Sequence, residues 1–160
     1  MSSDTAPTEG GPAGATPTLY VVVVGCGRLG SRLASSLSRQ GHSVVAIDND
    51  PATFGDLATD FSGFRLEGDA AQLAVLREAK APEADALIAT THDDNVNLMV
   101  AQVARNIFGV PHVLARVFDP KREEVYARLG IDTICPTTVA ADLFLSSVTE
   151  GAARLRRAAP

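Results

Sequence analysis

Residues 19–50 read LYVVVVGCGRLGSRLASSLSRQGHSVVAIDND, and this stretch decides the fold. A continuous apolar run at 19–24 leads directly into the glycine-rich turn GCGRLG at 25–30. A helix-like segment follows over 31–40, and a second apolar run at 44–47 ends in Asp48. This order of strand, glycine turn, helix, strand and acid is the context in which a G-x-G-x-x-G spacing indicates a nucleotide-binding unit.

Each part of the glycine turn has a physical role in such a unit. Gly25 allows the tight turn, Gly27 lets a pyrophosphate approach the backbone, and Gly30 lets the helix pack closely on the strand. The free N–H groups at the helix start face the phosphate. Cys26 occupies a variable position and is interpreted as a small filler, with a redox switch as the alternative. The turn as a whole, Leu29 included, is the candidate phosphate site, and the competing interpretation is a glycine turn in a nucleotide-free α/β domain.

The end of the second apolar run supplies candidate contacts to the ribose. Asp48 follows the glycines by about 20 residues, where a carboxylate accepts hydrogen bonds from the ribose hydroxyls. An acid there also repels a 2′-phosphate, which favours NAD or an adenine nucleotide over NADP. Asp50 either supports the same pocket, together with Asn49, or caps the helix that Pro51 opens, and capping is the favoured interpretation.

Composition limits the class of protein. The chain has 160 residues, of which 46% are hydrophobic and 21% charged, and its net charge is −5. These values predict one globular domain and argue against a non-specific nucleic-acid binder. No apolar run approaches the roughly 20 residues that span a bilayer, and the N-terminus lacks a signal-peptide pattern. Two cysteines without a disulfide framework favour a reduced compartment. We therefore expect a cytoplasmic protein without direct membrane insertion.

The pattern along the chain predicts a Rossmann-like fold. We expect a disordered tail over 1–18, a nucleotide-binding domain over 19–149 and a short tail over 150–160 that extends the last helix or frays. Short apolar runs alternate with amphipathic segments, which favours a doubly wound parallel sheet with helices on both faces and strand order 3-2-1-4-5-6. The expected strands are 19–24, 43–47, 64–67, 85–89, 112–117 and 131–135. The expected helices are 28–40, 51–60, 70–79, 93–108, 120–129 and 138–149.

Further motifs carry a more specific resemblance. They are GDA at 68–70, ADALIATT at 84–91, DDNVN at 93–97, ARV at 115–117 and LGIDTICP at 129–136. With the glycine turn, they resemble the TrkA-N domain, also called the RCK or KTN domain, over about 19–145. The resemblance implies a cytosolic gating subunit or domain of a bacterial potassium uptake system or potassium channel. It also implies binding of NAD(H), ATP or ADP, and homodimers that assemble into rings. Typical full-length members add a C-terminal ligand-binding subdomain, so the chain is expected to be a minimal member or part of a longer one.

The resemblance also implies roles for particular residues. Arg28 would pair with phosphate oxygens, Asp69 and Ala70 would border the adenine ring, and Asn97 would contact the ligand. Arg116 would present a positive charge to the phosphates of its own or a neighbouring subunit. Asp69 has a second interpretation as the N-cap of the following helix.

Residue types at the fourth strand suggest contacts without the resemblance. Thr90 and Thr91 end that strand beside the switch point, where their hydroxyls would reach phosphate or the distal ribose. His92 is interpreted as a solvated loop residue, and Asp93 and Asp94 as helix-start residues that satisfy backbone N–H groups in place of binding metal.

One departure from the family pattern concerns metal binding. Some members have Pro-Glu after the last strand, where the glutamate helps hold a divalent cation. Here the residues are Pro136 and Thr137. Hard cations prefer anionic oxygen ligands, so no metal site is predicted.

The favoured function is a nucleotide-sensing regulatory domain without catalytic residues. One alternative is a small NAD-dependent oxidoreductase, although His42, His92 and His112 form no obvious constellation. Another is a regulatory domain of a cation–proton antiporter. The last helix carries more apolar residues than one buried stripe needs, which predicts a dimer contact, with ordinary core packing as the alternative.

Overall fold

A six-stranded, all-parallel sheet forms the centre of the computed structural model, which describes residues 17–158. The strand order is β3-β2-β1-β4-β5-β6, so the predicted doubly wound topology is confirmed. The strands are β1 (Tyr20–Val24), β2 (Ser43–Asp48), β3 (Phe64–Glu67), β4 (Ala86–Ala89), β5 (His112–Arg116) and β6 (Asp132–Ile134). The expected disordered tail, apart from residues 17 and 18, lies outside the described residues.

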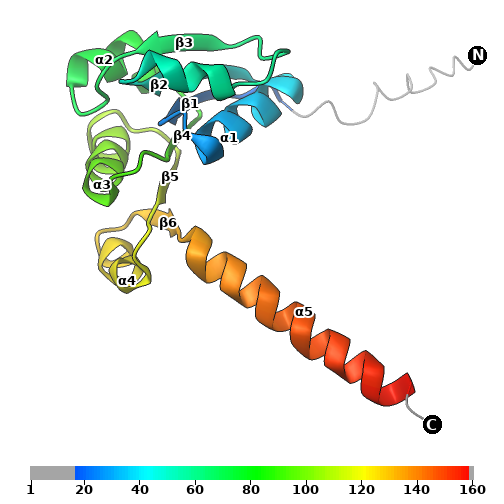
Figure 1. The fold of residues 1–160 in the computed structure, drawn as a ribbon. Coiled ribbons are helices and arrows are strands. Elements are labelled where there is room, and N and C mark those ends of the chain that lie inside the picture. Colours follow the sequence, from blue (N-terminus) through cyan, green and yellow to red (C-terminus); the bar gives the residue numbers. More distant parts are fainter. Residues whose placement is uncertain (1–16, 159–160) are drawn as a thin grey trace, which may run out of the picture.

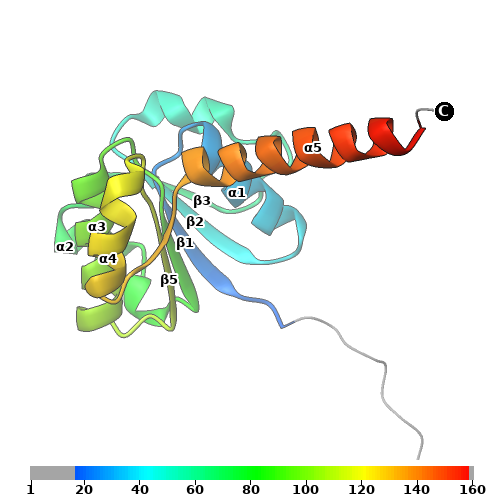
Figure 2. The same cartoon turned by 90° about the horizontal axis from the view of Figure 1, so that it is seen from below.

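Helices cover both faces of this sheet (Figures 1 and 2). The α-helices are α1 (Arg28–Arg39), α2 (Leu73–Glu78), α3 (Asp94–Gln102), α4 (Pro120–Arg128) and α5 (Pro136–Ala158). Two short 3₁₀ segments, η1 (Pro51–Asp56) and η2 (Ala81–Glu83), and one π-helical segment, η3 (Val103–Ile107), complete the order.

The four consecutive valines of β1 explain why this strand lies inside the sheet. Val21 and Val23 pack with Ala34 of α1 and with residues after η1, whereas Val22 and Val24 pack on the other face with Leu76 of α2 and residues of α3. All four valines are at most 1% exposed. A strand with two covered faces needs apolar residues on both, so the run shows no alternation.

Two expected helices are shorter than predicted, the first at its end and the second at its start. The helix expected at 51–60 is only η1, whose N-cap Asp50 accepts a hydrogen bond from the Ala52 amide at 2.9 Å. The helix expected at 70–79 begins only at Leu73. Asp69 accepts from the Ala71 amide at 2.9 Å and so stabilises the turn that precedes α2, while Gln72 is the N-cap. The prediction that Asp69 caps the helix itself is therefore wrong.

The last helix is longer than the expected 138–149. It begins at Pro136, because proline is favoured in the first helical turn, and it continues to Ala158. Every residue from 139 to 150 is exposed. Figure 1 shows this helix leaving the body of the molecule.

Candidate functional site

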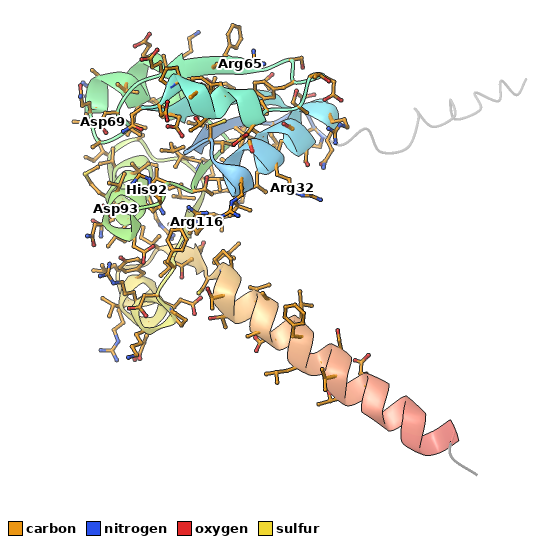
Figure 3. All side chains as sticks on the ribbon, in the orientation of Figure 1. Arg32, Arg65, Asp69, His92, Asp93 and Arg116 are labelled. Carbon is orange, nitrogen blue, oxygen red and sulfur yellow. The ribbon has the colours of Figure 1, made fainter. Side chains whose placement is uncertain are left out.

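A pocket of about 510 Å³ opens where strands β1 to β5 end. The strand order reverses between β1 and β4, and the crevice at such a switch point is where doubly wound folds bind ligands. Its lining residues are Val24, Gly25, Gly27, Arg28, Ile47, Asp48, Asn49, Asp50, Thr53, Gly68, Asp69, Ala70, Thr90, Thr91, His92, Asp93, Val96, Arg116 and Phe118. In Figure 3, Asp69 after β3, His92 after β4 and Arg116 at the end of β5 lie one below another.

The glycine turn has the shape that a phosphate site requires. Gly25 has φ +90°, and a Cβ there would lie 2.7 Å from the Thr91 backbone nitrogen. A Cβ on Gly30 would overlap the Gly25 carbonyl oxygen. Gly27 differs, because a Cβ there would meet nothing within 4 Å. Thus the first and third glycines are required by the protein itself, and the space over the second is open toward the pocket.

Asp48 holds the glycine turn as well as lining the pocket. Its Oδ2 accepts a hydrogen bond from the Cys26 amide at 2.6 Å, and its Oδ1 accepts from the Asp50 amide at 2.9 Å. A carboxylate has about four acceptor positions, so both oxygens keep capacity for ribose hydroxyls.

The Cys26 side chain points away from this site. It is 0% exposed and packs in the core beside α1. Burial, with a smaller contribution from the charge of Asp48, raises the pKa of the Cys26 thiol to about 11. A neutral thiol in the core agrees with the small-filler interpretation.

The two threonines after β4 use their hydroxyl groups within the protein. The buried Thr90 hydroxyl lies 3.1 Å from the Val24 carbonyl and 3.0 Å from the Gly25 carbonyl, to which it donates. The Thr91 hydroxyl donates to Asn97 Oδ1 at 2.7 Å. Both threonines line the pocket, and their hydroxyl protons already have acceptors there.

Arg116, at the end of β5, provides a positive charge on the opposite side of the pocket from Asp48. Its Nη2 donates to the Thr91 carbonyl at 2.6 Å, and its guanidinium carbon lies 4.2 Å from the centroid of the Phe118 ring. Its Nε is buried without a hydrogen-bond partner. Burial lowers the pKa of Arg116, the charge of Arg28 lowers it further, and Asp94 opposes the shift. Two guanidinium groups and an unsatisfied N–H therefore suit an anionic ligand.

The structure brings most of the predicted site residues to one pocket. Those that line it are Gly25, Gly27, Arg28, Asp48, Asn49, Asp50, Asp69, Ala70, Thr90, Thr91 and Arg116. Four others do not line it, namely Cys26, Leu29, Gly30 and Asn97. Asp50 combines both of its proposed roles, since it lines the pocket and caps η1.

Sequence reasoning missed several lining residues. They include Thr53, Gly68, Val96 and Phe118, and also His92 and Asp93, which were interpreted only as loop and capping residues. The capping prediction for Asp93 is confirmed, because its side chain accepts from the Asn95 and Val96 amides. Asp94 instead accepts from the Phe118 amide at 2.8 Å, so it connects α3 to the segment after β5. Phe118 follows Arg116 by two residues, and this nearness to a predicted site residue was the sequence signal that could have placed Phe118 at the pocket.

The described part of the chain contains neither a metal-binding cluster nor a membrane-spanning helix. Between residues 17 and 158 no group of three or more His, Cys, Asp or Glu side chains is arranged to hold a metal ion. Within the same range no helix combines the length and the apolar character that crossing a bilayer requires.

Comparison with known proteins identifies relatives over most of the chain. The TrkA-N domain profile matches residues 21–137. The Trk system potassium uptake protein TrkA of Streptomyces coelicolor is 46% identical over 127 residues, which are 79% of this chain and 57% of that protein. A TrkA homolog of Methanothermobacter thermautotrophicus is 33% identical over 132 residues, covering 82% of this chain and 61% of that protein. The chain thus spans about three fifths of the length of these curated relatives.

Solved structures give the same fold. The Shewanella denitrificans Kef CTD in an AMP-bound form superposes with a TM-score of 0.68 at 26% identity, covering 81% of this chain and 80% of that one. The TrkA-N domain of the inner membrane protein ybaL from Escherichia coli gives a TM-score of 0.71 at 20% identity, covering 82% and 98%. The second likeness concerns the fold alone.

Proposed function

This chain belongs to the TrkA-N domain family, and from that premise we propose that it is a nucleotide-sensing domain that regulates a potassium transporter or channel. The observation on which the proposal chiefly depends is the pocket at the switch point. It combines an open position over Gly27, a carboxylate with spare acceptor capacity at Asp48, and two arginines, Arg28 and Arg116.

The ligand that fits this arrangement is NAD(H) or an adenine nucleotide such as ATP or ADP. The glycine turn and the start of α1 would receive the phosphates, because helix N-terminal N–H groups favour negative charge. Asp48 would accept from the ribose hydroxyls, and Asp69 and Ala70 would border the base. The AMP-bound form of the Kef CTD supports an adenine nucleotide as the class of ligand.

Regulation would operate through linkage between this pocket and an assembly. A ligand shifts a conformational equilibrium only as far as its affinities for the two states differ. We propose a homodimer, assembling into a ring, that docks on the cytoplasmic face of a membrane potassium transport protein. The names of the TrkA relatives support this class of partner. The domain would then be cytoplasmic and peripheral to the membrane through its partner.

The relatives' names favour regulation over an oxidoreductase activity. His92 is the histidine that lines the pocket, and it is exposed. A dehydrogenase would need an acid or base placed against a substrate beside the cofactor, and we propose no such role for it.

Calorimetric titration of the purified chain with NAD, NADH, ATP, ADP and AMP tests the binding proposal. We expect at least one to bind and to raise the unfolding temperature, because a ligand of the native state stabilises by RT ln(1 + [L]/Kd). Absence of binding by all five would overturn it. Steady hydride transfer to added small alcohols, acids or aldehydes would instead favour the oxidoreductase.

A further inference from the structure

Asn97 of α3 is a polar side chain buried directly behind the pocket wall. It is 0% exposed and does not line the pocket. Its Oδ1 accepts from the Thr91 amide at 2.8 Å and from the Thr91 hydroxyl at 2.7 Å. Its Nδ2 donates to the Thr91 carbonyl at 3.0 Å and to the Arg116 carbonyl at 3.1 Å. An asparagine amide has two donors and two acceptor positions, and all four are used here. None remains for a ligand.

These bonds join the ends of two neighbouring strands. Thr91 follows β4 and Arg116 ends β5, and the two strands pair in the sheet. The Thr91 carbonyl that Asn97 contacts also accepts from Arg116 Nη2 at 2.6 Å. Asn97 therefore holds both the backbone of Arg116 and the acceptor that orients its guanidinium.

A second bond from the same helix holds the other neighbour of the guanidinium. One Asp94 oxygen accepts from the Phe118 amide at 2.8 Å, and the Phe118 ring lies 4.2 Å from the Arg116 guanidinium carbon. The start of α3 thus sets the position of Arg116 from two directions.

One N–H of the guanidinium held in this way has no partner among the described residues. Its Nε is buried without a hydrogen bond, and it lines the same pocket as Arg28, a second positive charge. An N–H of a guanidinium forms its strongest bonds with anionic oxygen, and phosphate oxygens supply that chemistry.

We infer that Asn97 is a positioning residue, which places Arg116 for the phosphate groups of the nucleotide without itself touching the nucleotide. This inference rests on the proposed function, because it assumes that a nucleotide occupies the pocket. It replaces the family-based expectation that Asn97 contacts the ligand.

The test measures how much the phosphates contribute to affinity. Dissociation constants of adenosine and of ADP are obtained by calorimetry for the full chain, Asn97→Ala, Arg116→Ala and the double variant. The quantity compared is the Kd for adenosine divided by the Kd for ADP, which falls when a contact to the phosphates is lost. We expect Arg116→Ala to lower this ratio by roughly tenfold, which corresponds to the loss of one charge-assisted hydrogen bond. Asn97→Ala should lower the ratio by about threefold or more, and the double variant should match Arg116→Ala alone.

A matched control removes a buried hydroxyl elsewhere. Ser38, which is 8% exposed, bonds Ser62 at the far end of α1 and does not line the pocket. Ser38→Ala should leave the ratio unchanged even where it lowers thermal stability.

Two results would overturn the inference while leaving the proposed function intact. Equal weakening of adenosine and ADP by Asn97→Ala would mean general structural support. A further fall in the ratio when Asn97→Ala is added to Arg116→Ala would mean a direct contact. If Asn97→Ala does not fold, Asn97→Ser keeps a short neutral hydroxyl, which cannot hold all four partners, and replaces Asn97→Ala in the same set of single and double variants. Wild-type protein that binds neither ligand would overturn the proposed function and this inference together.

Discussion

At the scale of single residues, Asp48 supports the glycine turn and is also the proposed ribose acceptor. Its two oxygens accept from the Cys26 and Asp50 amides. Removing the carboxylate therefore removes the proposed ribose acceptor and loosens the turn that would hold the phosphates. Spacing from the glycines predicted the first role, whereas the second depends on backbone directions that spacing does not specify.

Asp48→Ala should weaken nucleotide binding by more than the roughly 1–3 kcal/mol expected for one unpaired buried group. Calorimetry with the tightest-binding nucleotide measures the effect. Asp60→Ala is the control, because it removes the same charge from an exposed ion pair with Arg39. Unchanged affinity in folded Asp48→Ala protein would remove Asp48 from the site.

Cys26 offers a test by pH. Its pKa is raised to about 11, so the neutral thiol dominates near neutrality, and only on the order of 0.1% is thiolate at pH 8. The thiolate is the reactive form, and the side chain is fully buried. In a Cys135→Ser background, a thiol reagent should label native protein far more slowly at pH 8 than it labels urea-unfolded protein, whose thiol has its ordinary pKa of about 8.5. Equal labelling rates of native and unfolded protein at pH 8 would contradict this environment.

At the scale of elements, the glycine turn separates folding from binding. Gly27 has φ −70°, which any residue adopts, and a Cβ there meets open space. Gly30 has no such freedom, because a Cβ would overlap the Gly25 carbonyl oxygen. The motif therefore contains two glycines that the fold needs, Gly25 and Gly30, and one, Gly27, that the fold does not need and that we propose is kept free for a ligand.

Gly27→Val should leave the unfolding temperature nearly unchanged and abolish the thermal shift that nucleotide produces, since the side chain would occupy the phosphate space. Gly30→Ala should lower the unfolding temperature itself, because helix and turn must move apart. A wild-type nucleotide shift in Gly27→Val would show that this turn is not the binding turn.

Sequence predicted the sheet better than the helices, for identifiable reasons. The strands are apolar on both faces, so runs such as Val21 to Val24 mark them with little ambiguity. Short helices depend on local hydrogen bonds at their ends: Asp69 stabilises a tight turn that delays the start of α2, whereas η1 begins at Pro51 as predicted and ends early at Asp56. Likewise, the contacts that Asn97 makes with the ends of β4 and β5, and that Phe118 makes with Arg116, join segments that periodicity along the chain does not bring together.

At the scale of the whole molecule, α5 presents a surface that the other described residues, 17–135, do not cover. Between residues 139 and 150 every side chain is exposed. The apolar ones are 48–74% exposed and are Val139, Leu143, Phe144, Leu145 and Val148. Because α5 projects from the body (Figure 1), core packing within one chain does not account for them. A second copy that presents the same helix would cover a symmetric patch.

A single charge on this exposed face of α5 should prevent assembly. Leu143→Asp should convert a dimer into monomers, because the new charge would be buried without a partner at the contact. Since Leu143 is 64% exposed in the single chain, its replacement should leave the unfolding temperature of the monomer and its nucleotide affinity intact.

Thr149→Asp is the matched control. It adds the same charge to α5, but on the polar side of the helix, where Asp142 lies seven residues, or two helical turns, earlier. Sedimentation velocity measures the oligomeric state at a protein concentration of tens of micromolar, which is roughly where weak assemblies are half formed. Wild-type protein that sediments as a monomer there would refute the α5 dimer, and dissociation by Thr149→Asp alone would move the contact to the other face of the helix.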